Sequence, residues 1–284
     1  MSDYTIRTMS RQEVDWAVDM AAGEGWNPGL HDADSFHAQD PSGFLVGVLD
    51  GKPIGCISAI SYENTFGFIG FYIVAKEMRG KGYGMPLWHA AMDKLKGHVI
   101  GLDGVVEQQG NYTKSGFVFQ YSNIRFEHRT GDNSRTKEKP AITRPLSDAD
   151  TPVIAAYEHD LFPAARNAFL EKWLVQPGAL ALAAIDRFAL AGYGVIRPCR
   201  AGWKIGPLAA DSPEIAEDLF LELCSHAKPG DAVYLDVPEI NPQGMALAEK
   251  YGMKKVFGTA RMYTGQAPQL SLGKIFGVTT FELG

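Results

Sequence analysis

The feature that most constrains this chain of 284 residues is that one arrangement of landmarks occurs in it twice. Ile6 opens a short strand-like run, and Ile142 opens a similar run 136 residues later. Gly116, which ends a short helical stretch, is also followed 136 residues later by Gly252. Several landmarks in the same order at a nearly constant spacing indicate duplication of one α+β unit. The chain is therefore predicted to contain two similar α+β domains.

A polar segment without periodicity separates the two units. Residues 131–140 contain Gly, Asn, Ser, Lys and Pro and no apolar pattern, which is typical of a linker. We therefore expect one domain over residues 1–130 and a second over residues 141–284. Two domains also agree with the length of 284 residues, because a typical domain has ~150 residues.

Composition disfavours several classes of protein. With 45% hydrophobic and 21% charged residues the chain matches ordinary folded proteins, and no apolar run approaches the ~20 residues of a membrane-spanning helix. The first residues lack the apolar core of a signal peptide, so we expect a cytoplasmic protein. A net charge of −6 disfavours nucleic acid as the main partner.

The three cysteines do not form a metal or disulfide pattern. Cys56, Cys199 and Cys224 lie far apart and make neither a C-x-x-C pair nor a zinc spacing. They are predicted to be buried apolar residues in a reducing compartment, and no metal site is expected.

A glycine-rich loop in the first half predicts an anion-binding site. Residues 68–74 are apolar, β-branched and aromatic, which is typical of a strand, and apolar residues at helical spacing begin at Leu87. Glycines between a strand and a helix let the backbone approach a ligand, and the first helical amides are free to bind a pyrophosphate. The loop itself is Arg79-Gly80-Lys81-Gly82-Tyr83-Gly84.

Neither of two common phosphate-binding patterns is present in this loop. The P-loop needs Gly-Lys-Ser/Thr, which does not occur in the chain. The dinucleotide pattern fails because Met85 stands where its third glycine should be. Taken alone, the loop could also be a plain tight turn.

Together with two other segments, the loop resembles a known family. Arg79-x-x-Gly82-x-Gly84 is similar to the R/Q-x-x-G-x-G/A motif of the GNAT N-acetyltransferase superfamily. The preceding strand lies where that family has its central splayed strand, and the segment 111–117 resembles the family's Tyr-x-x-x-Gly-Phe segment. The resemblance covers residues 3–128, and the second half resembles the partner domain of tandem bacterial GNAT proteins.

The resemblance implies a fold and a reaction. Each domain would be a mixed, mostly antiparallel twisted sheet flanked by helices. The chain would transfer an acetyl group directly from acetyl-CoA, its co-substrate, to a small amine or amino-acid-like acceptor. A backbone N–H of the splayed strand would stabilise the thioester oxyanion. The residues expected to hold acetyl-CoA are Ile73, Val74, Arg79, Gly80, Lys81, Gly82, Tyr83 and Gly84.

The resemblance also implies catalytic roles. Tyr112 would be the general acid for the leaving thiolate, because a phenol with a pKa of ~10 is protonated at neutral pH. Glu63, just before the central strand, is expected to be the general base, because several relatives of this fold place a base there. Glu107, His98, Asp103 and water stay open as alternatives.

The loop after the first helix is the expected acceptor site. Glu24 and Trp26 could hold a cationic amine by charge and ring contact, although a buried Trp that merely anchors the loop is the alternative. Residues 275–281 are apolar and could add a strand to a sheet edge.

The second copy lacks the features that would bind CoA. Asp211 and Glu214 stand near the position of the glycine-rich loop, where they would repel phosphates. Ala248 stands at the position of Tyr112. The second domain is therefore predicted to be a degenerate copy that does not bind CoA.

Two other functions and the assembly state stay open. The chain could be a non-catalytic acyl-CoA sensor, or it could transfer a longer acyl chain. A small-molecule amine is expected as partner, with no nucleic acid and no membrane. Either a monomer or a homodimer is expected, because two fused copies can imitate a dimer.

Overall fold

The computed structural model describes residues 3–131 and 142–284, so the predicted linker lies, apart from Gly131, outside the described residues. The first half contains β1 (Tyr4–Thr8), α1 (Arg11–Gly23), α2 (Asp32–Gln39), β2 (Phe44–Leu49), β3 (Lys52–Tyr62), β4 (Phe66–Val74), η1 (Lys76–Met78), α3 (Gly84–Lys94), β5 (Val99–Val105), η2 (Val106–Gln108), α4 (Gln109–Lys114) and β6 (Phe117–Arg129). The second half contains β7 (Ile142–Pro145), η3 (Asp148–Asp150), α5 (Thr151–Glu158), α6 (Asn167–Trp173), β8 (Leu180–Asp186), β9 (Ala189–Pro198), β10 (Trp203–Ala210), α7 (Pro213–Cys224), β11 (Ala232–Pro238), α8 (Pro242–Lys250), β12 (Lys254–Thr264), η4 (Leu272–Lys274) and β13 (Ile275–Gly277). Strands β1–β6 and helices α1–α4 recur in the same order as β7–β12 and α5–α8, which confirms the duplication.

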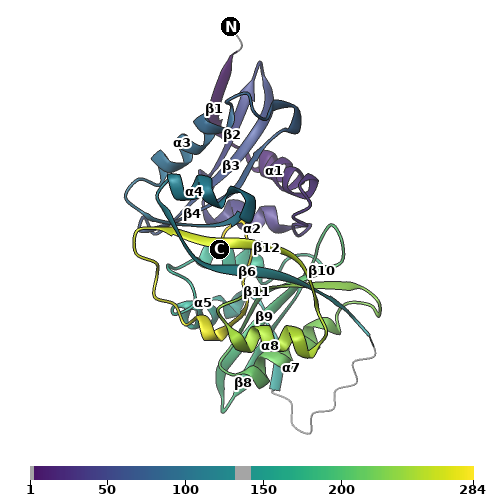
Figure 1. Cartoon of the computed structure of the whole chain (residues 1–284). Helices are drawn as coiled ribbons and strands as arrows, with labels where there is room; N and C mark the ends of the chain where they lie inside the picture. The colour runs from purple at the N-terminus through teal and green to yellow at the C-terminus, as the bar shows by residue number, and fades with distance from the viewer. Residues whose placement is uncertain (1–2, 132–141) are drawn as a thin grey trace.

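The strands form one continuous mixed sheet instead of two separate ones. Their order is β1-β2-β3-β4-β5-β12-β6-β11-β10-β9-β8-β7, and β13 pairs with β10. Each half gives its last long strand to the other half, since β12 lies beside β5 and β6 lies beside β11 (Figure 1). The boundary predicted at residues 131–140 lies between β6 and β7, and both halves contribute to the same sheet.

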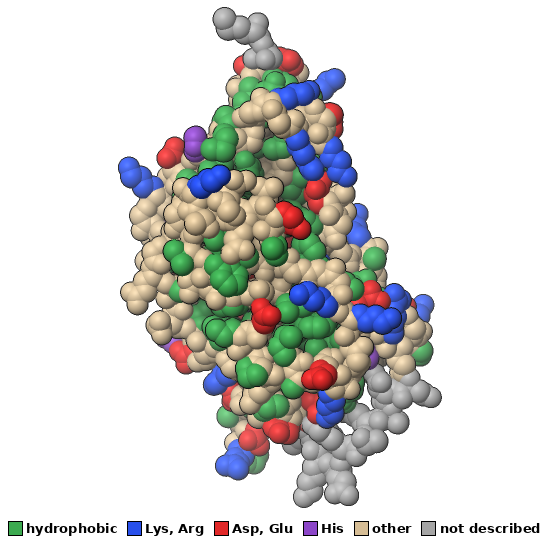
Figure 2. Space-filling view, viewed as in Figure 1, with side chains coloured by type: hydrophobic (Ala, Val, Ile, Leu, Met, Phe, Trp, Pro, Cys, Tyr) green, Lys and Arg blue, Asp and Glu red, His purple; other side chains and the backbone are tan. Residues whose placement is uncertain are grey.

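Helices cover both faces of the sheet, as expected for an α+β fold. Trp88 of α3 packs on one face of the first half, in a core with Ile69 of β4. On the other face, α1 and α2 share a core with α6 of the second half, where the Phe36 and Trp173 rings stack with centroids 6.1 Å apart. On the face drawn in Figure 2, Lys and Arg side chains lie intermixed with Asp and Glu.

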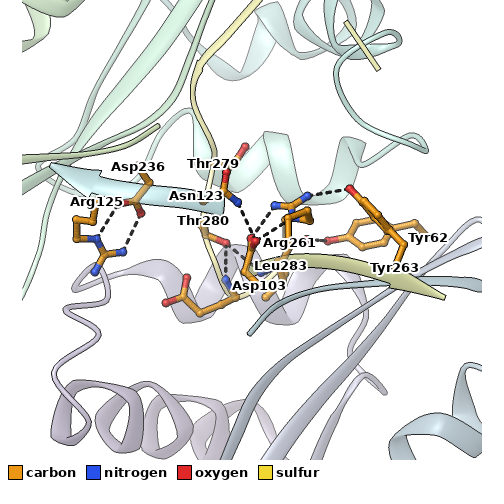
Figure 3. Close-up of polar contacts among 12 residues, drawn as sticks. Tyr62, Asp103, Asn123, Arg125, Asp236, Arg261, Tyr263, Thr279, Thr280 and Leu283 are labelled. Atoms are coloured by element: carbon orange, nitrogen blue, oxygen red, sulfur yellow. Dashed lines mark hydrogen bonds and ion pairs between the residues drawn. The ribbon is translucent and has the colours of Figure 1, made fainter. Parts of the chain in front are cut away.

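Two equivalent buried ion pairs hold the exchanged strands in register. Arg125 of β6 lies opposite Asp236 of β11, and their side chains form two hydrogen bonds of 2.7 and 2.8 Å. Arg261 of β12 lies opposite Asp103 of β5, with hydrogen bonds of 2.9 and 2.6 Å (Figure 3). Removing one partner of such a pair leaves an uncompensated buried charge, so the pairs disfavour any other strand register.

The parallel strands β4 and β5 part toward their carboxyl ends. Their pairing ends at Ile69 and Leu102, after which both strands continue without pairing to each other. At the same point β4 has an irregular register with β3, and Phe71 adopts a φ of 50°. A non-glycine residue in this left-handed region costs about 1–3 kcal/mol and is common at functional sites.

The equivalent strands β10 and β11 also part, but the chain itself fills the gap. Their pairing ends at Ile205 and Leu235. There β13 pairs antiparallel with β10, and the Val278 N–H donates to the Asp236 carbonyl of β11 at 2.8 Å. Asn241 holds the same segment, because its side-chain amide donates to the carbonyls of Gly273 and Ile275. The prediction that residues 275–281 add a strand is confirmed for β13, although the strand enters a gap within the sheet.

The prediction that the three cysteines are buried is confirmed, and all three are free. Ser10 and Glu13 form a capping box at the start of α1, and Ser212 caps α7 by accepting from the backbone. Within residues 3–131 and 142–284, no helix is long and apolar enough to cross a membrane.

Candidate active site

A cavity of about 770 Å³ opens where β4 and β5 part. Its wall is formed by both halves of the chain, because β12 and the segment after β13 contribute alongside β4, β5, α3 and α4. The lining residues are Glu24, Trp26, 69–74, Arg79, Met85, Trp88, His89, 102–105, Gln108, Asn111, Tyr112, Lys114, Ser115, Phe257, Thr259, Phe281 and Glu282.

The cavity brings together most of the residues that the sequence analysis singled out from separate segments. The expected acceptor residues Glu24 and Trp26, the cofactor-strand residues Ile73 and Val74, and the expected acid Tyr112 all line it. Arg79 also lines it, and the rest of the glycine-rich loop, residues 80–84, follows directly without being part of the wall.

The ring of Tyr112, a residue of α4, lies against β5 at a glycine. A Cβ atom at Gly104 would lie 2.3 Å from the ring of Tyr112, so only glycine lets this ring lie against the strand. The ring also packs against Trp88 of α3, with centroids 5.7 Å apart. Burial raises the pKa of Tyr112 to about 12, so the phenol is protonated at neutral pH. Its hydroxyl makes no hydrogen bond to any residue that the structure describes, which leaves its proton available.

The loop before α3 has the backbone that an anion site needs. Gly80 and Gly82 have φ values of 73° and 89°, and a Cβ at either position would meet no atom within 4 Å. Helix α3 begins at Gly84 without a side-chain cap, so its first amides stay available. Lys81 makes no ion pair with a described residue and is exposed beside these amides.

Arg79 points in another direction than expected. Its Nε donates to the Val74 carbonyl at 2.8 Å, and its Nη2 binds the Glu24 carboxylate at 2.6 Å. The guanidinium therefore ties the end of α1 to the end of β4. Of the two cations expected to meet phosphates, Lys81 is the one whose charge is not shared with a carboxylate.

Glu63 lies away from the cavity. It is exposed in the turn between β3 and β4 at a φ of 50°, and its carboxylate accepts from the Ala165 N–H at 3.3 Å. This turn is at the opposite end of β4 from the point where β4 and β5 part. The expected role of Glu63 as the base therefore has no geometric support.

The alternative bases are also poorly placed. Glu107 is exposed in η2 and does not line the cavity. His98 is hydrogen-bonded to the Ser61 hydroxyl at 2.8 Å and is likewise outside the lining. Asp103 does line the cavity, but both of its carboxylate oxygens are already bound by Arg261, at 2.9 and 2.6 Å.

Four lining residues come from the second half, and none of them was among the predicted site residues. Phe257 and Thr259 lie on β12, whereas Phe281 and Glu282 lie on the tail after β13. The Thr259 hydroxyl is buried without a hydrogen-bond partner in the described chain. No local pattern marks these residues, because they reach the cavity only through the strand exchange. The described residues contain no group of three or more His, Cys, Asp or Glu that could hold a metal ion.

Comparison with protein families places one match in each half of the chain. A model described as "Acetyltransferase (GNAT) family" matches residues 11–117. A second model, described as "Acetyltransferase (GNAT) domain", matches residues 154–277. Together the two matches span most of the described chain.

Similar proteins extend over the whole chain. A holothin acyltransferase from Pseudoalteromonas sp. (strain SANK 73390) is 28% identical over 281 residues, which are 99% of this chain and 95% of that protein. A crystal structure assigned to the acetyltransferases from Pyrococcus horikoshii is 23% identical with a TM-score of 0.82, and the match covers 99% of this chain and 96% of that one. A tandem GNAT protein from the clavulanic acid biosynthesis pathway is 12% identical with a TM-score of 0.65, covering 94% of this chain and 100% of that one. At these identities the two structures support the fold alone.

Proposed function

Because the chain belongs to the GNAT acyltransferase superfamily, with a domain of that family in each half, we propose that it transfers an acetyl group from acetyl-CoA to the amine of a small molecule. The observation that carries this proposal is the open cavity between the parted strands β4 and β5, lined by a protonated tyrosine. The similarity to a holothin acyltransferase supports an acyl transfer.

The parted strands fit an extended pantetheine arm. Beyond Ile69 the inner edge of β4 has no strand partner, so its backbone groups can bind a ligand as if it were an added strand. The loop at Gly80 and Gly82 and the start of α3 are suited to the pyrophosphate. A backbone N–H near Ile73 or Val74 would stabilise the developing oxyanion, which is typically worth ~3 kcal/mol of the barrier.

Tyr112 acts as the general acid in this proposal. Tyr112 lines the cavity together with Trp88 and Gly104, and its high pKa keeps the phenol protonated. As the carbon–sulfur bond breaks, Tyr112 gives its proton to the thiolate.

The acceptor compartment is aromatic and acidic. Trp26, Phe257 and Phe281 supply apolar walls, and Glu24 and Glu282 supply negative charge. Such a compartment favours a small primary amine with an apolar or aromatic body, because the ammonium is attracted by rings and carboxylates.

The proposal is tested by thermal unfolding and by release of free thiol. Acetyl-CoA at 100 times its dissociation constant should stabilise the chain by ~2.7 kcal/mol. Thiol release from acetyl-CoA should then depend on an added primary amine such as 2-phenylethylamine, and mass spectrometry should detect the acetylated amine. Binding without thiol release across a panel of alkyl- and arylamines would favour the acyl-CoA sensor instead. Absence of any stabilisation by acetyl-CoA would contradict both functions.

A further inference from the structure

Three carboxylates line the cavity, and two of them are already bound by arginines. Glu24 pairs with Arg79 at 2.6 Å, and Asp103 pairs with Arg261 at 2.6 Å. The third, Glu282, makes no hydrogen bond or ion pair through its carboxylate within the described residues. Among the described residues, Glu282 is therefore the lining carboxylate whose oxygens are not already bound by an arginine and can meet the ammonium of an acceptor.

The tail fixes the backbone of Glu282 against the point where the strands part. The Thr280 hydroxyl accepts from the backbone N–H groups of Glu282 and Leu283 at 3.2 and 3.0 Å. The Leu283 carbonyl accepts from the Tyr62 hydroxyl at 2.9 Å (Figure 3). A Cβ at Gly70 would lie 2.1 Å from the Glu282 carbonyl, so the tail touches β4 where only a glycine fits.

Glu282 and Tyr112 approach the cavity from opposite faces of the sheet. Tyr112 packs against the core that contains Trp88 of α3. Leu283, next to Glu282, belongs to the core that contains Phe68 and the helices α1 and α2. An acyl group held between the parted strands would therefore have the acid on one side and Glu282 on the other.

The surroundings of Glu282 suit a proton acceptor. Its side chain is 3% exposed, and this burial raises its pKa above the usual range of a glutamate. Nearby cations oppose this rise, and a nearby aspartate reinforces it. The charged groups that face Glu282 are Lys204 of β10, Arg125 of β6, Arg197 of β9 and Asp32 of α2.

A threonine of the second half lines the cavity together with Glu282. Thr259 lines the wall, and its hydroxyl is buried without a partner among the described residues. It lies on β12 two residues before Arg261, on the strand that the second half contributes.

We infer that Glu282, carried by the tail of the second half, is the general base that takes the proton from the acceptor amine. This inference rests on the proposed function. The ammonium of the acceptor gives one proton to the Glu282 carboxylate, and the neutral nitrogen attacks the thioester carbonyl carbon. A carbon–nitrogen bond forms, the carbon–sulfur bond breaks, and the thiolate takes the proton of Tyr112. The second half, although it does not bind CoA itself, completes the site of the first.

The test is the pH dependence of kcat/KM for Glu282→Gln, with acetyl-CoA and 2-phenylethylamine as substrates. In the wild type, kcat/KM should rise with pH as Glu282 ionises, because the base works only above its pKa. We expect Glu282→Gln to lose this rise of kcat/KM with pH and to lower kcat/KM at pH 7 by about 100-fold or more. With aniline, which is already neutral at pH 7, the loss should be less than about tenfold. Acetyl-CoA should bind the variant as it binds the wild type.

A charge-balanced variant separates catalysis from stability. Glu282→Gln removes a carboxylate near the buried Lys204 and should therefore lower the unfolding temperature. The double variant Glu282→Gln with Lys204→Met removes both charges, so it should recover the unfolding temperature but not the activity. Recovery of activity in this double variant, or a Glu282→Gln enzyme within about threefold of the wild type, would overturn the assignment. The assignment would also be overturned if Glu63→Gln lost the rise of kcat/KM with pH. Binding of acetyl-CoA by a wild type that acetylates neither amine would instead overturn the proposed function, and the role of Glu282 with it.

Discussion

The two halves build the same pair of parting strands and use the gap between them differently. Between β4 and β5 the gap is an open cavity, whereas between β10 and β11 the chain's own β13 occupies it. A gap between parallel strands exposes backbone groups that need a partner. One copy leaves them open to the cavity, and the other satisfies them with its own tail. Duplication thus preserved the scaffold twice and the open gap once.

The two halves share the ion pairs that hold the strands together and differ in the loop before the helix that follows the central strand. The Arg–Asp pairs that hold the exchanged strands occur in both copies, Arg125 with Asp236 and Arg261 with Asp103. The positive-φ glycines before α3, in contrast, have no counterpart before α7, which a Ser–Pro sequence starts. This contrast predicts which substitutions affect stability and which affect ligand binding or turnover.

The largest expected effect concerns the shared ion pairs. Asp236→Asn and Asp103→Asn should each lower the free energy of unfolding by about 3–5 kcal/mol, because each leaves a buried arginine without its carboxylate. Urea denaturation measures this loss. The control Asp236→Leu with Arg125→Met should recover most of it, since removing both charges removes the uncompensated one. A loss below about 1 kcal/mol for both single variants would show that the pairs do not hold the strand exchange.

The next effect concerns Tyr112, the proposed acid, whose counterpart in the second half is Ala248. Tyr112→Phe should lower kcat by about 100-fold or more while leaving acetyl-CoA binding unchanged, because only proton donation is removed. Steady-state thiol release measures it. Tyr72→Phe is the matched control, since Tyr72 lines the same cavity and should lose only a few-fold. Equal rates for Tyr112→Phe and the wild type would remove the acid assignment.

A smaller effect concerns the glycine-rich loop. Gly82→Asn and Gly82→Asp both tolerate the left-handed backbone, and they differ only in charge. The Asp variant should bind acetyl-CoA roughly tenfold more weakly than the Asn variant, because its carboxylate faces the phosphates. Calorimetric titration compares the two. Gln243→Glu, which adds the same charge at the start of α8 in the second half, should leave binding unchanged; equal affinity of the two Gly82 variants would place the phosphates elsewhere.

The smallest effect concerns the acceptor loop. Glu24→Gln breaks a partly exposed ion pair with Arg79 and should change the free energy of unfolding by less than about 1 kcal/mol. The KM for 2-phenylethylamine should nevertheless rise about threefold to tenfold, because a carboxylate of the acceptor compartment is lost. An unchanged KM would assign Glu24 to the structural ion pair alone.

Local patterns predicted the parts of the molecule that local physics determines. The strand predicted over residues 68–74 and the glycine-rich loop after it both depend on residues close together in the sequence. The duplicated landmarks predicted two copies of one α+β unit for the same reason, because each copy repeats the same short sequence patterns in the same order.

The strand exchange and the wall of the cavity depend on contacts across the chain. Nothing near Arg125 indicates that its partner is Asp236, 111 residues away. Glu282 likewise has no local pattern, because it becomes a lining residue only when the tail passes β13 and reaches Gly70. Glu63 was expected from its place before β4, but that place is at the far end of the strand.

The central claim is that one half binds acetyl-CoA and the other half has filled the equivalent gap with its own chain. The number of acetyl-CoA molecules bound per chain, measured by calorimetric titration of the wild type and of Gly82→Asp, tests it most directly. We predict one site per chain, strongly weakened by Gly82→Asp. Two sites per chain, or one site whose affinity Gly82→Asp leaves unchanged, would contradict the account.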